Sequence, residues 1–202
     1  MIGIIDCGMG NIASIKNMLK KAGADSCILS EAKEVENADK LILPGVGSFD
    51  VGIGRIRDGG FDQAIFRHVE KGKPLLGICL GMRLLGCASE EGQEKGLGLI
   101  PFRSVRFRFG EDSELKIPHM GWDYIRSEGE NPLTEGIDDT YRYYFVHSYH
   151  ALCEKKENVL FTCEYGYEFA AGVVQGCVYG VQFHPEKSHK YGMKLLGNFI
   201  RI

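Results

Sequence analysis

Cys79 is the residue whose type and surroundings most clearly suggest chemistry. It follows the apolar run 75–78 and precedes Leu80, after which apolar residues recur with helical spacing. This pattern predicts a strand, a tight turn and a helix with the cysteine at the turn, as in a nucleophile elbow. Gly77 and Gly81 would permit the crowded backbone, and the helix N-terminus would favour the thiolate. A buried structural thiol is the alternative interpretation of this stretch alone.

A second motif supplies the groups that would assist such a nucleophile. A predicted strand ends at His184, and Glu186 follows two residues later. Residues two apart in extended backbone point to the same face, so the carboxylate can orient the imidazole and stabilise its charged form. Strand ends of a parallel sheet converge, which would bring His184 to Cys79. A surface histidine is the alternative, but the combination with Glu186 and Cys79 favours a triad.

A glycine-rich turn could complete this site. Pro44-Gly45-Val46-Gly47 follows the apolar run 40–43. The backbone N–H groups of Val46 and Gly47, with that of Leu80, could stabilise an oxyanion. An ordinary strand-to-helix turn is the alternative. A phosphate loop is disfavoured, because the Lys and Ser/Thr of the Walker pattern are missing.

The first half of the chain alternates short apolar strands with helices. This rhythm predicts an α/β fold with a mainly parallel sheet. The strands are expected at residues 2–5, 27–29, 40–43 and 75–78, the helices at 12–22 and 61–70, and a polar helix or turn at 31–38.

After Cys87 the rhythm changes to consecutive strands joined by short polar links, which predicts added antiparallel strands. Gln175-Gly176 is a candidate hairpin turn, and residues 188–202 have the spacing of an amphipathic helix. The absence of linkers and repeats predicts one domain over residues 1–202. The strands are expected at 105–109, 121–125, 141–146, 149–153, 159–163, 169–174 and 177–183.

The composition narrows the class of protein. The chain has 202 residues, 44% hydrophobic and 25% charged, and its net charge of −3 gives no argument for nucleic acid or a membrane surface. The seven cysteines are scattered without CxxC spacing, which favours reduced thiols and a cytoplasmic location. No signal peptide or membrane-length run is expected. Neither a metal nor a cofactor is expected: His119 and His150 lack ligand spacing and are interpreted as structural, and Gly8-Met9-Gly10 lacks the third glycine of a dinucleotide site.

The residues at the two chemical motifs carry a family resemblance. Residues 77–82 and 183–186 resemble class I, triad-type, glutamine amidotransferases, which implies a flavodoxin-like fold with helices flanking a mainly parallel sheet and added antiparallel strands. Further stretches resemble the glutaminase subunits of imidazole glycerol phosphate synthase over essentially the whole chain. These stretches are residues 6–11, 44–47, 118–122, 144–149 and 184–187.

The resemblance implies a reaction. Cys79 would attack the side-chain amide of L-glutamine, His184 would protonate the departing ammonia, and Glu186 would hold His184. Water would then release glutamate. The ammonia would pass to a (β/α)8-barrel cyclase subunit, the partner in a heterodimer of histidine biosynthesis.

The resemblance also implies residue roles beyond the triad. Val46 and Gly47 would shape the oxyanion hole. Alternative interpretations are a half-buried aromatic for Trp122 and a solvated charge for Lys187. Glutamine contacts map onto Gly47, Leu80, Glu91, His147, Ser148 and Tyr149, and the interface with the barrel onto Asn11, Met120, Trp122 and Lys187.

Two residues depart from the family pattern. Arg83 stands where the family usually has Gln, and Cys7 where it usually has Tyr. Arg83 lies one helical turn after Cys79, so it could bind the glutamine carboxylate or mark a changed site. Similar proteins supply ammonia to sugar amidotransferases in surface-glycan pathways, which is a second functional hypothesis. A non-catalytic regulatory partner and a cysteine peptidase are further alternatives.

Overall fold

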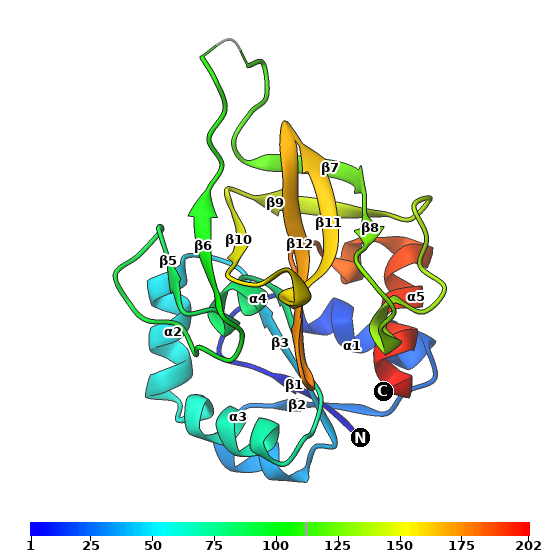
Figure 1. Cartoon of the computed structure of the whole chain (residues 1–202). Helices are drawn as coiled ribbons and strands as arrows, with labels where there is room; N and C mark the ends of the chain where they lie inside the picture. Colours follow the sequence, from blue (N-terminus) through cyan, green and yellow to red (C-terminus); the bar gives the residue numbers. More distant parts are fainter. Residues whose placement is uncertain (112) are drawn as a thin grey trace.

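The computed structural model describes residues 1–111 and 113–202. Its centre is a sheet whose first five strands in spatial order are parallel, and helices cover both faces of this sheet (Figure 1). The predicted α/β fold with a parallel core is therefore confirmed. These strands are β2 (Ser26–Leu29), β1 (Ile2–Ile5), β3 (Lys40–Gly45), β4 (Leu75–Cys79) and β13 (Val178–Val181).

Two helical layers bury the faces of this sheet. The helices α1 (Ile12–Lys21) and α5 (His189–Arg201) lie on one face, and α2 (Phe49–Asp58) and α3 (Phe61–Glu70) on the other (Figure 1). Each helix directs one apolar stripe inward, as the 3.6-residue period requires. A short 3-10 helix, η1 (Ala32–Asn37), occupies the stretch expected to be a polar helix or turn.

Beyond β13 the sheet becomes mostly antiparallel. β12 (Tyr167–Gln175) forms a hairpin with β13, as Gln175-Gly176 predicted, and the sheet continues through three further strands. β11 (Val159–Tyr165) also pairs with β12, and β8 (Arg126–Ser127) pairs with the other edge of β11. The three further strands are β10 (Tyr149–Cys153), β6 (Phe102–Arg106) and β5 (Ala88–Ser89).

A separate two-stranded sheet, β7 (His119–Tyr124) with β9 (Arg142–His147), was not predicted as a separate unit. Helix α2 was also missed, because two glycines within it weaken the helical pattern. The strand expected at 105–109 is β6 at 102–106, and the short β5 and β8 have too few residues to show a period. The single domain stays a prediction, which the continuous sheet through both halves of the chain supports.

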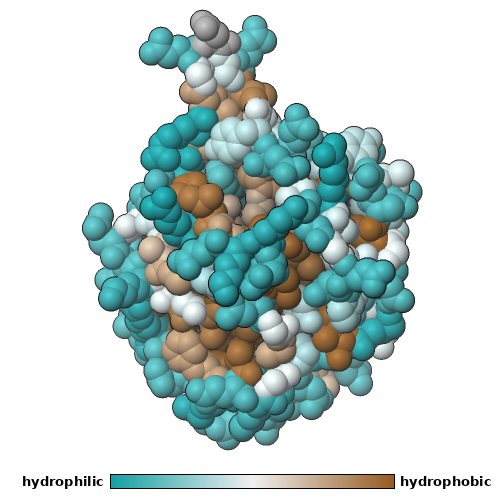
Figure 2. Space-filling model, viewed as in Figure 1, coloured by the Kyte–Doolittle hydropathy of each residue, from teal (hydrophilic) through white to brown (hydrophobic). Residues whose placement is uncertain are grey.

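The surface, the cysteines and the short helices complete the description of the fold. Hydrophilic side chains surround apolar areas near the centre of the face seen in Figure 2, and the described residues on either side of residue 112 project from the body (Figure 1). All seven cysteines are free thiols. Within residues 1–111 and 113–202, no helix has the length and apolarity needed to cross a bilayer. Three short 3-10 helices complete the elements: η2 (Pro132–Thr134), η3 (Lys156–Asn158) and η4 (Pro185–Lys187).

Glycines allow strands β3 and β4 and the helix that follows Cys79 to pack closely around the Cys79 turn. A Cβ on Gly81 would lie 1.8 Å from the carbonyl oxygen of Leu43, and one on Gly77 would lie 2.8 Å from the backbone of Gly81. A Cβ on Gly45 would also lie 2.8 Å from the Gly81 nitrogen. These contacts are between backbones, so they cannot be relieved by a rotamer change. The expectation that Gly77 and Gly81 permit a crowded turn is confirmed.

This packing gives a stability prediction. Gly81→Ala should lower the free energy of unfolding by about 3 kcal/mol or more, because the new methyl overpacks a backbone contact. Gly54→Ala is the matched control, since its Cβ would meet open space on helix α2 and alanine favours a helix by about 1 kcal/mol. Urea denaturation measures both. Equal stabilities of the two variants would contradict the prediction.

Candidate active site

Three neighbouring parallel strands end at the same edge of the sheet. β4 lies between β3 and β13, with Gly45 paired to Cys79 and Val181 to Ile78. The residues that follow these strands therefore leave the sheet side by side. This register brings the turn at Val46, the cysteine and the segment of His184 together, as the convergence of parallel strand ends predicts.

The backbone at Cys79 adopts a conformation that side chains rarely tolerate. Its φ is 55° and its ψ −111°, and helix α4 (Leu80–Leu85) begins at the next residue. Such strained conformations cost about 1–3 kcal/mol and persist where surrounding packing enforces them. The turn is the strand-to-helix elbow expected from the sequence, and it aims the sulfur out of the sheet.

His184 and Glu186 form a buried pair. The Nδ1 of His184 donates to Oε1 of Glu186 at 2.7 Å, and both side chains are almost fully buried. Burial lowers the pKa of His184, but the interactions with Cys79 and Glu186 outweigh it and raise the pKa to about 10. The Nε2 of His184 has no hydrogen-bond partner among the described residues. The His184 ring is therefore a charged imidazolium at neutral pH. The proton on its Nε2 is not engaged in a hydrogen bond with any described residue and can be donated.

One cavity of about 350 Å³ collects most of the predicted residues. It contains the nucleophile candidate, the imidazole, the proposed oxyanion donors and both charged groups predicted to bind glutamine. Glu186 lies behind His184 and does not line it. The predicted lining residues are Val46, Gly47, Cys79, Leu80, Arg83, Glu91, His147, Ser148, Tyr149 and His184, and the sequence analysis missed Pro118 and Val146.

Arg83 and Glu91 form an ion pair in this cavity. The Arg83 side chain is 6% exposed, its guanidinium lies 4.8 Å from the centre of the Tyr149 ring, and its Nε has no partner among the described residues. Glu91 accepts a hydrogen bond from the Phe49 amide at 3.0 Å, and the Arg83 guanidinium donates one to the Ser89 hydroxyl at 3.2 Å. The cavity thus presents one positive and one negative group, which suits a zwitterionic ligand.

His147 lines the cavity, but both nitrogens of its ring are bonded to other parts of the protein. Its Nδ1 donates to the carbonyl of Tyr149 at 2.9 Å, and its Nε2 bonds to the His119 ring at 3.0 Å. Both ring nitrogens are therefore occupied within the protein, so any contact of His147 with a ligand uses its backbone. Across the described part of the chain, no group of three or more His, Cys, Asp or Glu side chains is placed to hold a metal ion.

Gln182 is a residue at the site that the sequence analysis missed. It is fully buried, and its Nε2 lies 3.7 Å from the Cys79 sulfur. Its Oε1 has no partner among the described residues, an unusual state for a buried polar atom. A glutamine between Val181 and Phe183 in an otherwise apolar run was the available signal.

Ser188 is a second missed residue, and it holds the His184 segment in place. Its hydroxyl donates to the His184 carbonyl at 2.6 Å and accepts from the Tyr144 amide at 3.0 Å. The Tyr144 carbonyl in turn accepts from the His184 amide at 2.9 Å. These bonds tie the His184 backbone to strand β9, which forms another wall of the cavity.

The predicted interface residues are all exposed, and part of them form a cluster. Trp122 is 38% exposed and Met120 61%, and both lie on β7. Trp122 contacts the Tyr144 ring edge-on, and the Lys187 ammonium lies 5.6 Å from the centre of the same ring. Asn11 lies at the N-terminus of α1, and no contact described here joins it to this cluster.

The match to known families agrees with this geometry. The sequence model described as "Glutamine amidotransferase class-I" matches residues 3–202. The chain belongs to the class I glutamine amidotransferase family. The full-length match means that the fold, the elbow and the His184 segment are all part of the matched region.

Curated relatives indicate a subgroup of this family to which the chain is similar. The chain is 51% identical to "Imidazole glycerol phosphate synthase subunit HisH 2" of Methanococcus maripaludis, with 100% of this chain and 99% of the relative covered. It is 47% identical to the protein of the same name in Pseudomonas aeruginosa, with both covered fully, and 46% to a HisH subunit of Sulfurimonas denitrificans, covering 100% and 98%. These identities place the amidotransferase among the HisH subunits.

Solved structures support the fold. A structure named PurLQS from Thermotoga maritima aligns with a TM-score of 0.76 at 19% identity, covering 99% of this chain and 97% of that one. A "glutamine amidotransferase" crystal structure aligns with a TM-score of 0.73 at 22% identity, covering 97% and 98%. At such identities the likeness concerns the arrangement of helices and strands.

Gln182 gives a prediction about the reactivity of the cysteine. Gln182→Leu should slow iodoacetamide alkylation of Cys79 at neutral pH by about tenfold, because the thiolate loses a hydrogen-bond donor. Peptide mass spectrometry follows the reaction, and the exposed Cys87 in the same sample is the internal control. An unchanged alkylation rate for Cys79 would show that the amide does not stabilise the thiolate.

Glu186 gives a prediction about pH. Glu186→Gln should lower the pKa of His184 from about 10, because the carboxylate that favours the imidazolium is lost. The imidazolium then disappears at lower pH, so the alkaline limb of kcat/KM for glutamine hydrolysis should move to lower pH. Glu157→Gln, which removes an exposed carboxylate, should leave the profile in place. An unmoved alkaline limb in Glu186→Gln would contradict the assigned pairing.

Proposed function

We propose that this protein hydrolyses L-glutamine to glutamate and ammonia, with Cys79, His184 and Glu186 as the catalytic triad. The observation that carries the proposal is the single cavity that holds the elbow cysteine, the imidazolium and the Arg83–Glu91 pair. Each group occupies a position that acyl transfer requires: a nucleophile, an acid and a charged anchor for the substrate.

The steps follow from the chemistry of these groups. The Cys79 thiolate attacks the side-chain amide carbon, which forms a tetrahedral intermediate. His184 gives its proton to the amide nitrogen and the C–N bond breaks. Ammonia departs, and a thioester remains on Cys79. The now neutral imidazole removes a proton from water, which attacks the thioester carbonyl. Cleavage of the C–S bond releases glutamate and restores the thiolate and the imidazolium.

Backbone amides stabilise the oxyanion in this scheme. Leu80 follows the nucleophile, and its N–H lies at the start of α4. Val46 and Gly47 follow the strand paired to β4, and Gly47 has a φ of 107°, which orients the peptide in a way that favours glycine. Donors placed at the developing charge typically contribute about 3–4 kcal/mol to catalysis.

The polar end of glutamine meets the charged pair. Glu91 binds the α-ammonium group and Arg83 the α-carboxylate, since both residues line the cavity. The backbone of His147, Ser148 and Tyr149 forms the opposite wall. This arrangement exposes the side-chain amide of the substrate to Cys79.

The ammonia passes to a partner subunit. The relatives are named as subunits of imidazole glycerol phosphate synthase, which supports a heterodimer that serves histidine biosynthesis. We propose a (β/α)8-barrel cyclase as the partner, docked on the exposed cluster of Trp122, Met120 and Lys187, with Asn11 as a further contact. A cytoplasmic location accords with this role and with the seven free thiols.

A second acceptor is favoured by a specific observation. Arg83 stands where the family resemblance implies a glutamine residue, and it lies in the substrate cavity paired with Glu91. The same glutaminase chemistry would then supply ammonia to a sugar amidotransferase. Growth of a histidine-requiring strain that lacks its own HisH separates the acceptors, because only the first function restores growth without histidine.

The triad gives a direct prediction. Cys79→Ala should abolish glutamine hydrolysis, because no other group in the cavity can form the thioester. Cys87→Ala, which changes an exposed thiol outside the cavity, should retain full activity. Ammonia release in a coupled assay measures both, and addition of the partner with its ligand should raise the wild-type rate. Hydrolysis by Cys79→Ala at the wild-type rate would overturn the proposed mechanism.

A further inference from the structure

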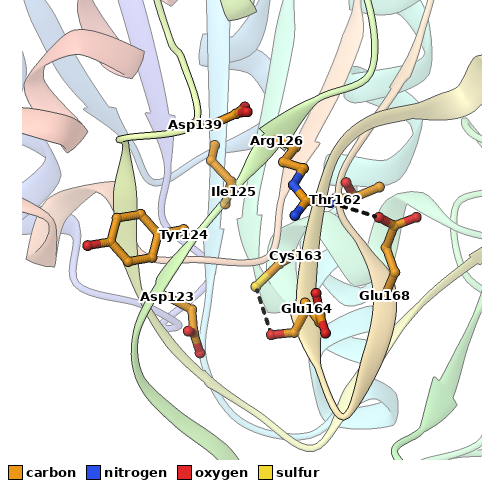
Figure 3. Close-up of a pocket in the computed structure, with 9 residues that line it drawn as sticks. All are labelled: Asp123, Tyr124, Ile125, Arg126, Asp139, Thr162, Cys163, Glu164 and Glu168. Carbon is orange, nitrogen blue, oxygen red and sulfur yellow. Dashed lines mark hydrogen bonds and ion pairs between the residues drawn. The ribbon is translucent and has the colours of Figure 1, made fainter.

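A chain of hydrogen-bonded side chains connects two cavities through the β7–β9 sheet. The Oδ2 of Asp123 lies 2.7 Å from Nε2 of His119, and Nδ1 of His119 lies 3.0 Å from Nε2 of His147. The Nδ1 of His147 then donates to the Tyr149 carbonyl at 2.9 Å. Asp123 lines an outer cavity of about 310 Å³ (Figure 3), whereas His147 and Tyr149 line the active-site cavity.

Counting protons shows what this chain of bonds requires. The Tyr149 carbonyl can only accept, so His147 carries its proton on Nδ1 and accepts at Nε2. His119 must then donate from Nδ1, and its Nε2 faces a carboxylate. Three hydrogen bonds need three protons, but two neutral imidazoles carry two. The complete chain therefore holds one further proton, shared between His119 and Asp123.

The surroundings keep this chain rigid. The ring of His119 is 1% exposed and is stacked between Phe145 and Tyr165, with ring centres 4.8 and 4.0 Å away. Burial lowers the pKa of His119 below its ordinary value, and the Asp123 carboxylate offsets this lowering only in part. Burial also lowers the pKa of His147, which is therefore neutral, as the proton count requires.

The end of the chain lies at the wall that receives glutamine. The corner between β9 and β10 consists of His147, Ser148 and Tyr149. The Ser148 carbonyl is held by the Phe107 amide at 3.1 Å, and the Tyr149 carbonyl by His147. The Tyr149 ring also lies over Arg83, so the orientation of this corner affects both the backbone wall and the charged anchor.

We propose that Asp123 and His119 are positioning residues, which hold the 147–149 corner in its glutamine-binding geometry through a proton that they share. This inference rests on the proposed glutaminase function. When the shared proton is lost, two lone pairs face each other where one hydrogen bond of the chain had been. The 147–149 corner is then held less firmly. The affinity for glutamine then depends on the protonation of a pair that does not touch the substrate.

Other titratable groups near the pair could also affect its proton. The outer cavity that Asp123 lines is also lined by Glu164 and Cys163 of β11, Glu168 of β12, Asp139 of the loop before β9 and Arg126 of β8 (Figure 3). Arg126 is itself paired with Glu168. On the inner side, His150 and Arg83 act on His147, and Tyr165 covers His119.

Two substitutions of similar size at position 123 and one control at position 139 test the proposal. Asparagine can donate from its amide to Nε2 of a neutral His119, so Asp123→Asn completes the chain without the extra proton. Leucine can neither donate nor accept, so Asp123→Leu breaks the chain at every pH. Asp139→Asn removes a carboxylate from the same outer cavity without touching His119, and it controls for a general charge effect.

The measurement is KM and kcat of the full chain for glutamine from about pH 5.5 to 8.5, the range in which histidine pairs titrate. Asp123→Leu should raise KM about tenfold, the effect of losing one charge-assisted hydrogen bond, with a smaller change in kcat. The ratio of wild-type KM to that of Asp123→Asn should rise with pH, because the wild-type loses the shared proton. Asp139→Asn should follow the wild-type at every pH.

Different results identify failure of the proposed function and failure of the positioning role. A wild-type chain without glutaminase activity would overturn the proposed function itself. An active wild-type whose KM ratio to Asp123→Asn stays constant across the pH range, or an Asp123→Leu variant with wild-type KM, would overturn the positioning role while leaving the function intact. Thermal melting of all variants identifies any loss of fold.

Discussion

The close approach of three backbones at Cys79 is the constraint on which the site depends. The cysteine can hold a φ of 55° only because Gly81 and Gly45 let helix α4 sit directly on the end of strand β3. Any side chain there would push the helix away and release the strain at the turn. The energy of a well-packed parallel sheet is thus used to keep one thiol in a conformation that a free peptide would avoid.

The rest of the cavity follows from the neighbours of that strand. β3 supplies backbone amides, β13 supplies the imidazole, and the hydrogen bonds of Ser188 tie the imidazole segment to β9. Strand β9 then carries the corner at His147, so the antiparallel part of the protein forms the wall that faces the parallel part. The mixed sheet is what brings the rigid Cys79 turn of β4 and Tyr149 of β10, in the opposite wall of the cavity, together on one continuous sheet.

The sequence predicted the features that local patterns encode. Cys79 with its glycines, and His184 with Glu186, depend on residues close in the chain, and the structure places them as expected. The contact of Gln182 with Cys79 joins residues 103 positions apart, and the Arg83–Glu91 pair and the His119–His147 bond depend on loop conformation and strand pairing. No periodicity reports such contacts, so His119 was interpreted only as a structural histidine.

The position of β13 in the sheet has a consequence for how the protein is made. This strand pairs with β4, yet it lies far from β4 in the sequence, and His184 follows just beyond its end. Chains emerge from the ribosome N-terminus first, and contacts between distant residues form late. The elbow thiol is therefore synthesised well before its acid–base partner. A nascent chain that ends before His184 lacks part of the proposed triad and is expected to leave glutamine intact.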